Sequence, residues 1–203
     1  MGGTAGPGPR VSWAGPRSAR SVRRSNGVAE TVAPGGSRVI TVADASPTDA
    51  DLAHLARTVE LAWLSREAGN HPFGAVLVGA DGTVLVEAGN TVGTTGDVTG
   101  HAETNLVRLA TTTVDRALLP GSTLYSNAEP CAMCAGAIYW ARIGRLGYAL
   151  SERELYDMIG PDDRNPTLLL PSRQVFASGQ RPMTVVGPVE MPGAREVHDG
   201  FWG

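Results

Sequence analysis

The sequence predicts a three-layer α/β domain with a mixed β-sheet. Three observations carry this prediction: a helical period opens the folded part, a β-hairpin follows it, and helices and strands then alternate. With 42% hydrophobic residues, the chain can bury an ordinary core. Its 203 residues suit one domain with a tail, and no apolar run approaches the roughly 18 residues that a membrane span needs.

The first 45 residues differ from the rest in composition and charge. They are rich in Gly, Pro, Ser and Arg without a sustained hydrophobic period, which predicts a disordered, dispensable tail before a folded domain at residues 46–203. The tail holds six Arg and two acidic residues, whereas the domain holds eleven Arg and eighteen acidic residues. Because nucleic-acid affinity rests on cationic contacts to phosphates, the acidic domain favours a small-molecule substrate.

A helix is expected to open the domain at residues 46–69. Ser46 is placed to cap this helix, Pro47 suits its first turn, and apolar residues recur at helical spacing until Gly69. His54 falls at the edge of the apolar stripe, so a packing or surface role is favoured over a ligand role. Two short strands follow, and the Asp-Gly sequence between them is typical of a hairpin, at residues 73–78 and 83–89.

Helices and strands alternate after the hairpin. The expected order is helix, strand, helix and strand, at residues 100–114, 122–127, 131–143 and 145–150. Residues 151–182 are expected to be irregular. A late strand at residues 183–189 and a short closing helix or tail complete the domain.

Composition also limits the chemistry. All seventeen basic residues are Arg, so Schiff-base catalysis and a P-loop, which need a Lys amine, are excluded. The two cysteines, Cys131 and Cys134, cannot make a disulfide framework, which favours an intracellular, cytoplasmic protein. Because the chain has no long apolar run, we expect that it does not enter a membrane.

A compound motif surrounds the two cysteines. His101-Ala102-Glu103 precedes Pro130-Cys131-Ala-Met-Cys134, which matches the general H-x-E…P-C-x-x-C signature of zinc deaminases. One imidazole and two thiolates supply three ligands and leave the fourth position of a tetrahedral zinc ion to water. We therefore expect one zinc ion per chain at His101, Cys131 and Cys134, and we expect Glu103 to transfer protons.

Other interpretations of the motif stay open at this point. The cysteines could form a thioredoxin-like redox pair, or a closed structural zinc site with a fourth ligand from His54, His71 or His198. A catalytically silent zinc module for protein or RNA binding is a further alternative. None of these interpretations gives a role to the carboxylate of Glu103.

From about Ala50 to Leu150 the sequence resembles the cytidine-deaminase-like superfamily, in the branch of guanine, cytosine and tRNA adenosine deaminases. The segments that carry the resemblance are HPFGAVLV, AGN, HAE and EPCAMCAGAIYWARIGRLGYA. PFGAV and AIYWAR are most similar to bacterial guanine deaminases. The resemblance implies a three-layer α/β/α fold and zinc-dependent hydrolytic deamination of a nucleobase or related heterocycle, with guanine as the expected substrate. The alternatives are a tRNA adenosine, cytosine, nucleoside or triazine deaminase.

The resemblance also implies contacts to the substrate and a homodimer. Asn90 would hydrogen-bond the base, Phe73 and Trp140 would wall its ring, and the backbone N–H of Ala102 would meet its reacting end. The chain departs from the guanine deaminases before the histidine, where residues 97–100 replace their usual Asp-Pro-Thr-Ala.

The resemblance fades after Leu150, in the region that selects the substrate in this branch. Asp162 and Asp163 lie there and could supply a carboxylate to a purine N–H.

Overall fold

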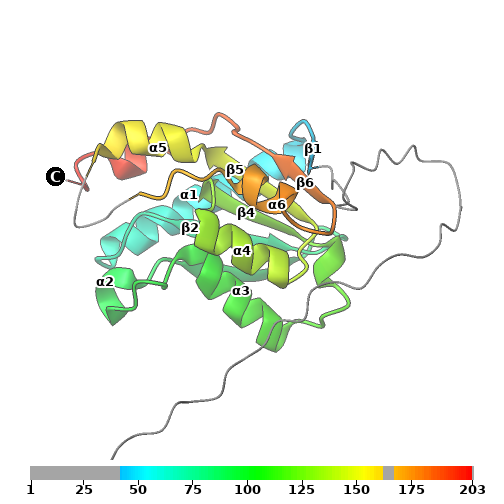
Figure 1. The fold of residues 1–203 in the computed structure, drawn as a ribbon. Helices are drawn as coiled ribbons and strands as arrows, with labels where there is room; N and C mark the ends of the chain where they lie inside the picture. Colours follow the sequence, from blue (N-terminus) through cyan, green and yellow to red (C-terminus); the bar gives the residue numbers. More distant parts are fainter. Residues whose placement is uncertain (1–41, 162–166, 203) are drawn as a thin grey trace, which may run out of the picture. The chain divides into compact units, whose positions relative to one another are not determined.

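A computed structural model describes residues 42–161 and 167–202 of the chain (Figure 1). Six strands form one sheet in the order β1-β6-β5-β4-β2-β3. Neighbouring strands from β1 to β4 run parallel, whereas β2 is antiparallel to both β4 and β3, so the predicted mixed sheet is confirmed. The strands are Val42–Asp44 (β1), Gly74–Val78 (β2), Val84–Gly89 (β3), Thr123–Ala128 (β4), Arg145–Leu150 (β5) and Met183–Val186 (β6).

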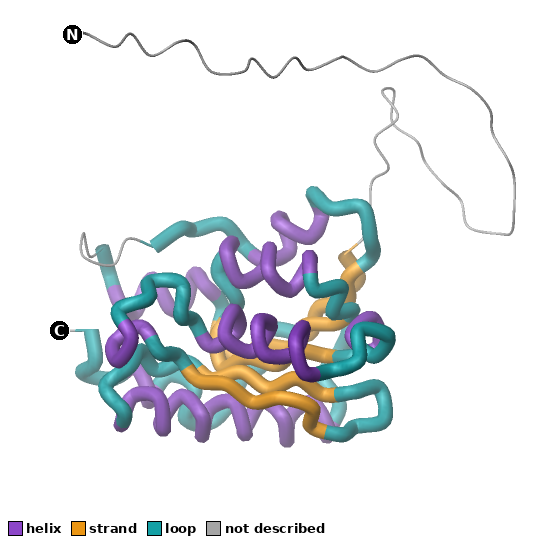
Figure 2. The backbone as a smooth tube through the Cα atoms, turned by 90° about the horizontal axis from the view of Figure 1, so that it is seen from below, coloured by secondary structure: helices purple, strands orange, loops and turns teal. Residues whose placement is uncertain are grey.

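Helices cover both faces of the sheet, as Figure 2 shows. α1 packs on one face, and α3, α4 and α6 pack on the other. Among the helices of the described residues, none combines the length and apolar character needed to cross a bilayer. The helices are Asp49–Glu67 (α1), Val92–Thr95 (α2), Ala102–Thr113 (α3), Ala132–Trp140 (α4), Glu152–Ile159 (α5) and Ser172–Ala177 (α6), with 3₁₀ turns at Leu119–Gly121 and Glu196–His198.

The central strand β2 is buried on both faces because its side chains alternate between two cores. Ala75 and Leu77 lie in the core shared with α3 and α4, whereas Val76 and Val78 pack with Leu55 of α1. This burial explains why the strand is a continuous apolar run in the sequence.

The first helix begins later than expected. Its N-cap is Thr48, whose hydroxyl accepts a hydrogen bond from the backbone N–H of Asp51 at 3.2 Å, while the Asp51 carboxylate accepts from the Thr48 N–H at 2.8 Å. The prediction of Ser46 as the cap is therefore wrong, because the reciprocal capping box at Thr48 satisfies two backbone donors.

The expectation that residues 151–182 are irregular is wrong in part, because α5 and α6 lie there. Ser151 caps α5 by accepting from the N–H of Glu154, and the Glu154 carboxylate accepts in return from the N–H of Ser151. The Ser-x-x-Glu sequence was a signal for this helix.

The domain begins before residue 46, since β1 belongs to the sheet. Val42 pairs with Met183 of β6, and the N–H of Ala45 donates to the carbonyl of Val185 at 3.1 Å. The predicted tail therefore includes one edge strand, and this correction moves the domain boundary to residue 42 or earlier.

Two truncations test this boundary. Deleting residues 1–41 is expected to leave the melting temperature and the turnover nearly unchanged, because the composition of that segment predicts no contribution to a core. Deleting residues 1–45 removes β1 and is expected to lower the melting temperature by about 4 °C or more. Calorimetry measures the melting temperature of each truncated protein. Equal melting temperatures would contradict a stabilising role for β1.

Candidate active site

The motif residues meet where two parallel strands end. β4 ends at Ala128 and β5 at Leu150, and the N–H of Glu129 donates to the carbonyl of Leu150 at 2.7 Å. Ligands of open α/β sheets bind at the carboxyl ends of such strands. His101 is the N-cap of α3 and Cys131 is the N-cap of α4, so the two helices deliver their first residues to the same edge.

Three side chains there form a group able to hold a metal ion. Nδ1 of His101 lies 3.7 Å from Sγ of Cys131 and 3.6 Å from Sγ of Cys134, and the three atoms lie within 4.8 Å of one another. A tetrahedral zinc ion, with Zn–S distances of about 2.3 Å and a Zn–N distance of about 2.0 Å, places such donors about 3.6 Å apart. The residues therefore fit zinc.

The electrostatics of the group differ between its two sulfurs, because the hydrogen bond between the cysteines raises the pKa of Cys134 and lowers that of Cys131. The hydrogen bond between the two cysteines, supported by His101, lowers the pKa of Cys131 to about 4, so this sulfur is a thiolate at neutral pH. The position of Cys131 at the start of α4 acts in the same direction, because the positive end of a helix stabilises a thiolate.

Among the described residues, no fourth side chain belongs to the metal-binding group. His54 instead packs its ring 5.1 Å from that of Tyr125, and His198 packs against Phe73 at 5.4 Å. The alternative of a closed structural site is therefore not met, because the group contains none of His54, His71 and His198, and three ligands leave one position open for chemistry.

Glu103 lies in the first turn of α3 with only 4% of its surface exposed. Burial raises the pKa of its carboxyl group, and the hydroxyl of Ser126 donates to Oε1 at 2.9 Å. A raised pKa makes this carboxyl group a better proton acceptor than a free carboxylate, which suits general acid–base chemistry.

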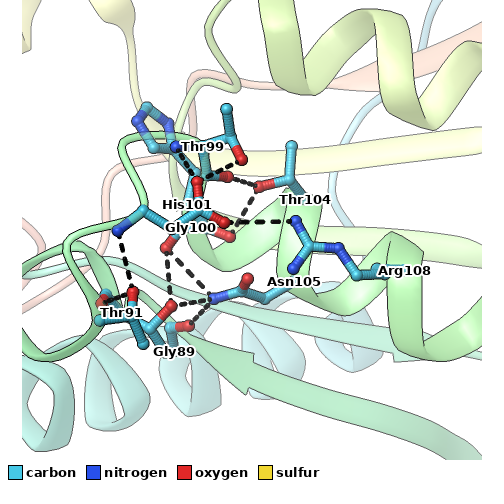
Figure 3. A network of polar contacts seen from close by, with 10 residues as sticks. Gly89, Thr91, Thr99, Gly100, His101, Thr104, Asn105 and Arg108 are labelled. Carbon is cyan, nitrogen blue, oxygen red and sulfur yellow. Dashed lines mark hydrogen bonds and ion pairs between the residues drawn. The ribbon is translucent and has the colours of Figure 1, made fainter.

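A network of polar contacts fixes the loop that carries His101 (Figure 3). The side-chain amide of Asn105, on α3, donates to the carbonyl of Gly89 at 3.0 Å, to the hydroxyl of Thr91 at 3.0 Å and to the carbonyl of Gly100 at 3.1 Å. These contacts join the end of β3 to the start of α3. The network therefore restrains the segment between β3 and α3, which contains Asn90 and ends at His101.

A cavity of about 290 Å³ opens beside the metal-binding group. One part of its wall is apolar and the other part is polar and acidic. Its lining includes Phe73, Val98, Leu155, Ile159, Leu168 and Trp202 on the apolar side, and His71, His101, Glu103, Glu129, Cys131 and Glu152 on the polar side. A flat heterocycle fits such a site, because the apolar walls can cover its faces while the polar groups meet its edge.

The structure places the four residues that were predicted to contact the substrate in different environments. Phe73 lines the cavity. The buried side-chain nitrogen Nδ2 of Asn90 has no hydrogen-bond partner among the described residues, while its Oδ1 accepts from the N–H of Val92 at 2.9 Å. Ala102 is the first residue of α3, where the backbone N–H has no acceptor within the helix. Neither Asn90 nor Ala102 lines the cavity and both are buried, so their contacts to a substrate stay predictions.

Trp140 does not belong to the cavity, which corrects its predicted role. It is the last residue of α4, and 82% of its surface is exposed. The helix begins at the metal ligands, so its last turn lies at the far end from the site.

The C-terminal segment supplies one aromatic residue to the cavity. Trp202 lines the cavity, and its ring lies 5.3 Å from that of His71 and 6.1 Å from that of Phe73. Its Nε1 donates to Nδ1 of His198 at 3.3 Å.

Two acidic residues of the wall, Glu129 and Glu152, were not singled out in the sequence. Glu152 was missed because the α5 segment was expected to be irregular. Asp162 and Asp163, which the sequence suggested as substrate ligands, lie outside the described residues.

Comparisons with known proteins agree with this site. The family described as "Cytidine and deoxycytidylate deaminase zinc-binding region" matches residues 48–150. A Schizosaccharomyces pombe protein named "Probable cytosine deaminase" is 40% identical over 155 residues, which cover 76% of this chain and 94% of that protein. The guanine deaminase of Bacillus subtilis is 45% identical over 96 residues, which cover 47% of this chain and 61% of that protein. A structure from a study of A-to-I editing by tRNA:A34 deaminases has a TM-score of 0.50 at 34% identity and covers 67% of this chain and 96% of that chain.

Proposed function

Because the chain belongs to the zinc-binding cytidine and deoxycytidylate deaminase family, and so is a hydrolytic deaminase, we propose that its substrate is a free, uncharged nucleobase, with cytosine preferred. The observation that carries this proposal is the acidic cavity beside the metal-binding group. Glu103, Glu129 and Glu152 line it, and no Arg does so within residues 42–161 and 167–202. A phosphorylated substrate would be repelled there, because like charges in a partly desolvated site interact strongly.

The extent of similarity favours cytosine over other bases. The alignment with the fission-yeast protein spans 155 residues and 94% of that protein, whereas the alignment with the Bacillus subtilis enzyme spans 96 residues and 61% of that enzyme. Guanine, the substrate expected from the sequence motifs, is the second candidate, and the 45% identity to the Bacillus subtilis enzyme supports it.

The side chains of the cavity divide the work of a hydrolytic deamination. When bound, zinc supplies the Lewis acidity that lowers the pKa of the attacking water. Glu103 accepts the proton of this water, delivers it to a ring nitrogen, and then helps the amino group to leave as ammonia. The water oxygen forms the new C–O bond as the C–N bond breaks. Asn90 and the N–H of Ala102 hold the base in position by donating hydrogen bonds, and Phe73 packs against its ring.

Ammonia release from a panel of compounds tests the substrate. We expect cytosine to be deaminated fastest, with much slower release from cytidine, deoxycytidylate and a tRNA that carries adenosine at the wobble position. Faster release from guanine would replace cytosine with the second candidate. Preference for deoxycytidylate or tRNA would overturn the proposal of a free base, and no release from any compound would favour the silent zinc module.

We also propose that the protein is a homodimer whose subunits meet through α4. Trp140, the last residue of this helix, is 82% exposed, whereas Met133 near its start lines the cavity. Trp is enriched in protein interfaces, so the exposed ring of Trp140 is the contact that we propose. The predicted location in the cytoplasm stays a prediction.

Sedimentation equilibrium tests the dimer. We expect the wild-type mass to be twice that of the chain, and Trp140→Glu to shift the protein to a monomer, because the new charge would be buried in the interface. Trp63→Glu is the control, since Trp63 is 38% exposed on α1. A wild-type monomer, or a Trp140→Glu variant that stays dimeric, would contradict the proposed interface.

A further inference from the structure

We propose that Glu152 is a specificity-determining residue whose carboxylate accepts a hydrogen bond from an N–H group of the base. The inference rests on the proposed function and adds a recognition contact to it. Glu152 lines the same cavity as His101, Cys131 and Glu103. It is 8% exposed, so its carboxylate is held away from bulk water and faces the space that a base would occupy.

The other two carboxylates of the wall already have partners in the protein. Glu103 accepts from the hydroxyl of Ser126 at 2.9 Å. Oε1 of Glu129 accepts from the N–H and the hydroxyl of Ser172, at 2.9 and 2.7 Å, and its Oε2 accepts from the N–H of Glu152 at 3.1 Å. Within residues 42–161 and 167–202, the carboxylate of Glu152 receives no such hydrogen bond. Among the three carboxylates of the wall, Glu152 is therefore the one without a hydrogen-bond donor from the described residues, and we infer that a ligand supplies this donor.

The protein holds Glu152 in a fixed position. It is the first residue of α5, and the capping box between Ser151 and Glu154 sets where this helix begins. The bond from its N–H to Glu129 joins it to the segment directly before Cys131. Because Glu129 lies two residues before Cys131, this bond also fixes the position of Glu152 relative to the metal ligands.

The environment of Glu152 is unfavourable for a carboxylate without a ligand. Burial, followed by the nearby negative charges of Cys131 and Glu129, raises the pKa of Glu152 to about 7. Buried acids without partners destabilise a protein, and such groups persist where function requires them. A neutral N–H of the substrate would supply a donor that the described residues do not provide, and a hydrogen bond to a charged group changes affinity by about 10- to 100-fold.

Glu152→Met tests this role because methionine has a similar length and cannot accept the hydrogen bond from the base. At pH 8 we expect the KM for the deaminated base to rise about 10- to 100-fold, with kcat within about threefold of wild type. We also expect zinc content to be unchanged and the melting temperature to be equal or higher, since a buried charge is removed. Asp157→Asn is the matched control, because it neutralises an exposed acid on the same helix.

The combined readouts separate recognition from a structural role. A rise in KM together with an equal or higher melting temperature supports the proposal. An unchanged KM, or a lower melting temperature with loss of zinc, would overturn it. Binding of uracil, the product from cytosine, is measured by calorimetry in the wild type and in Glu152→Leu, a second variant whose side chain cannot accept a hydrogen bond. Weaker binding in that variant supports the proposal and equal binding overturns it. Absence of turnover in the wild type would count against the proposed function alone, because the binding measurement does not depend on turnover.

Discussion

Glu103→Gln is expected to abolish deamination while leaving the zinc content and the fold unchanged. The amide keeps the shape of the carboxylate and can still accept the hydrogen bond from Ser126, which is 2.9 Å long in the protein. It cannot take a proton from the attacking water or return one to the base. General acid–base catalysis contributes typically 10²–10⁴-fold, and one group that serves several proton transfers is expected to contribute at least the upper end of that range.

The measurement combines ammonia release with elemental analysis. Glu67→Gln, at the exposed end of α1, is the control for the loss of one carboxylate. Substantial activity in Glu103→Gln would mean that another acid, such as Glu152, Asp162 or Asp163, transfers the proton. A Glu103→Gln protein without zinc would mean that Glu103 is a ligand, and the open-site mechanism would then be wrong.

A Cys131→Ser/Cys134→Ser double variant is expected to lose its zinc and all of its activity. Serine is close to cysteine in size, so the packing of α4 should be kept. Its hydroxyl is not ionised at neutral pH, however, whereas the pKa of Cys131 is lowered to about 4. His101 alone would then remain as a strong ligand, and one imidazole does not retain zinc at micromolar concentration.

Zinc content measured by elemental analysis, with circular dichroism to monitor folding, decides this prediction. Met133→Leu is the matched control, because Met133 lies between the two cysteines on α4 and is not part of the metal-binding group. The wild type and this control should hold about one zinc ion per chain. A wild type without tightly bound metal, or a double variant with unchanged zinc, would disprove the metal site.

The sequence by itself determined the metal-binding group. His101, Cys131 and Cys134 could be predicted because zinc chemistry restricts which residue types can serve and because each half of the motif lies in one local segment, whereas the catalytic role of Glu103 stays a prediction. The mixed sheet was predictable for a similar reason. The hairpin and the alternation of helix and strand after it follow from local periods and turn residues.

Only the tertiary structure decided which residues form the wall of the cavity. Glu152 and Trp202 lie far from the motif in the sequence, and they reach the cavity because β5 places α5 beside Cys131 and the C-terminal turn packs on Phe73. Trp140 shows the converse, since it follows Cys134 by less than two turns and yet lies outside the cavity. Local sequence sets the spacing along a helix, but which end of that helix meets a cavity depends on packing between distant segments, and no local pattern records that packing.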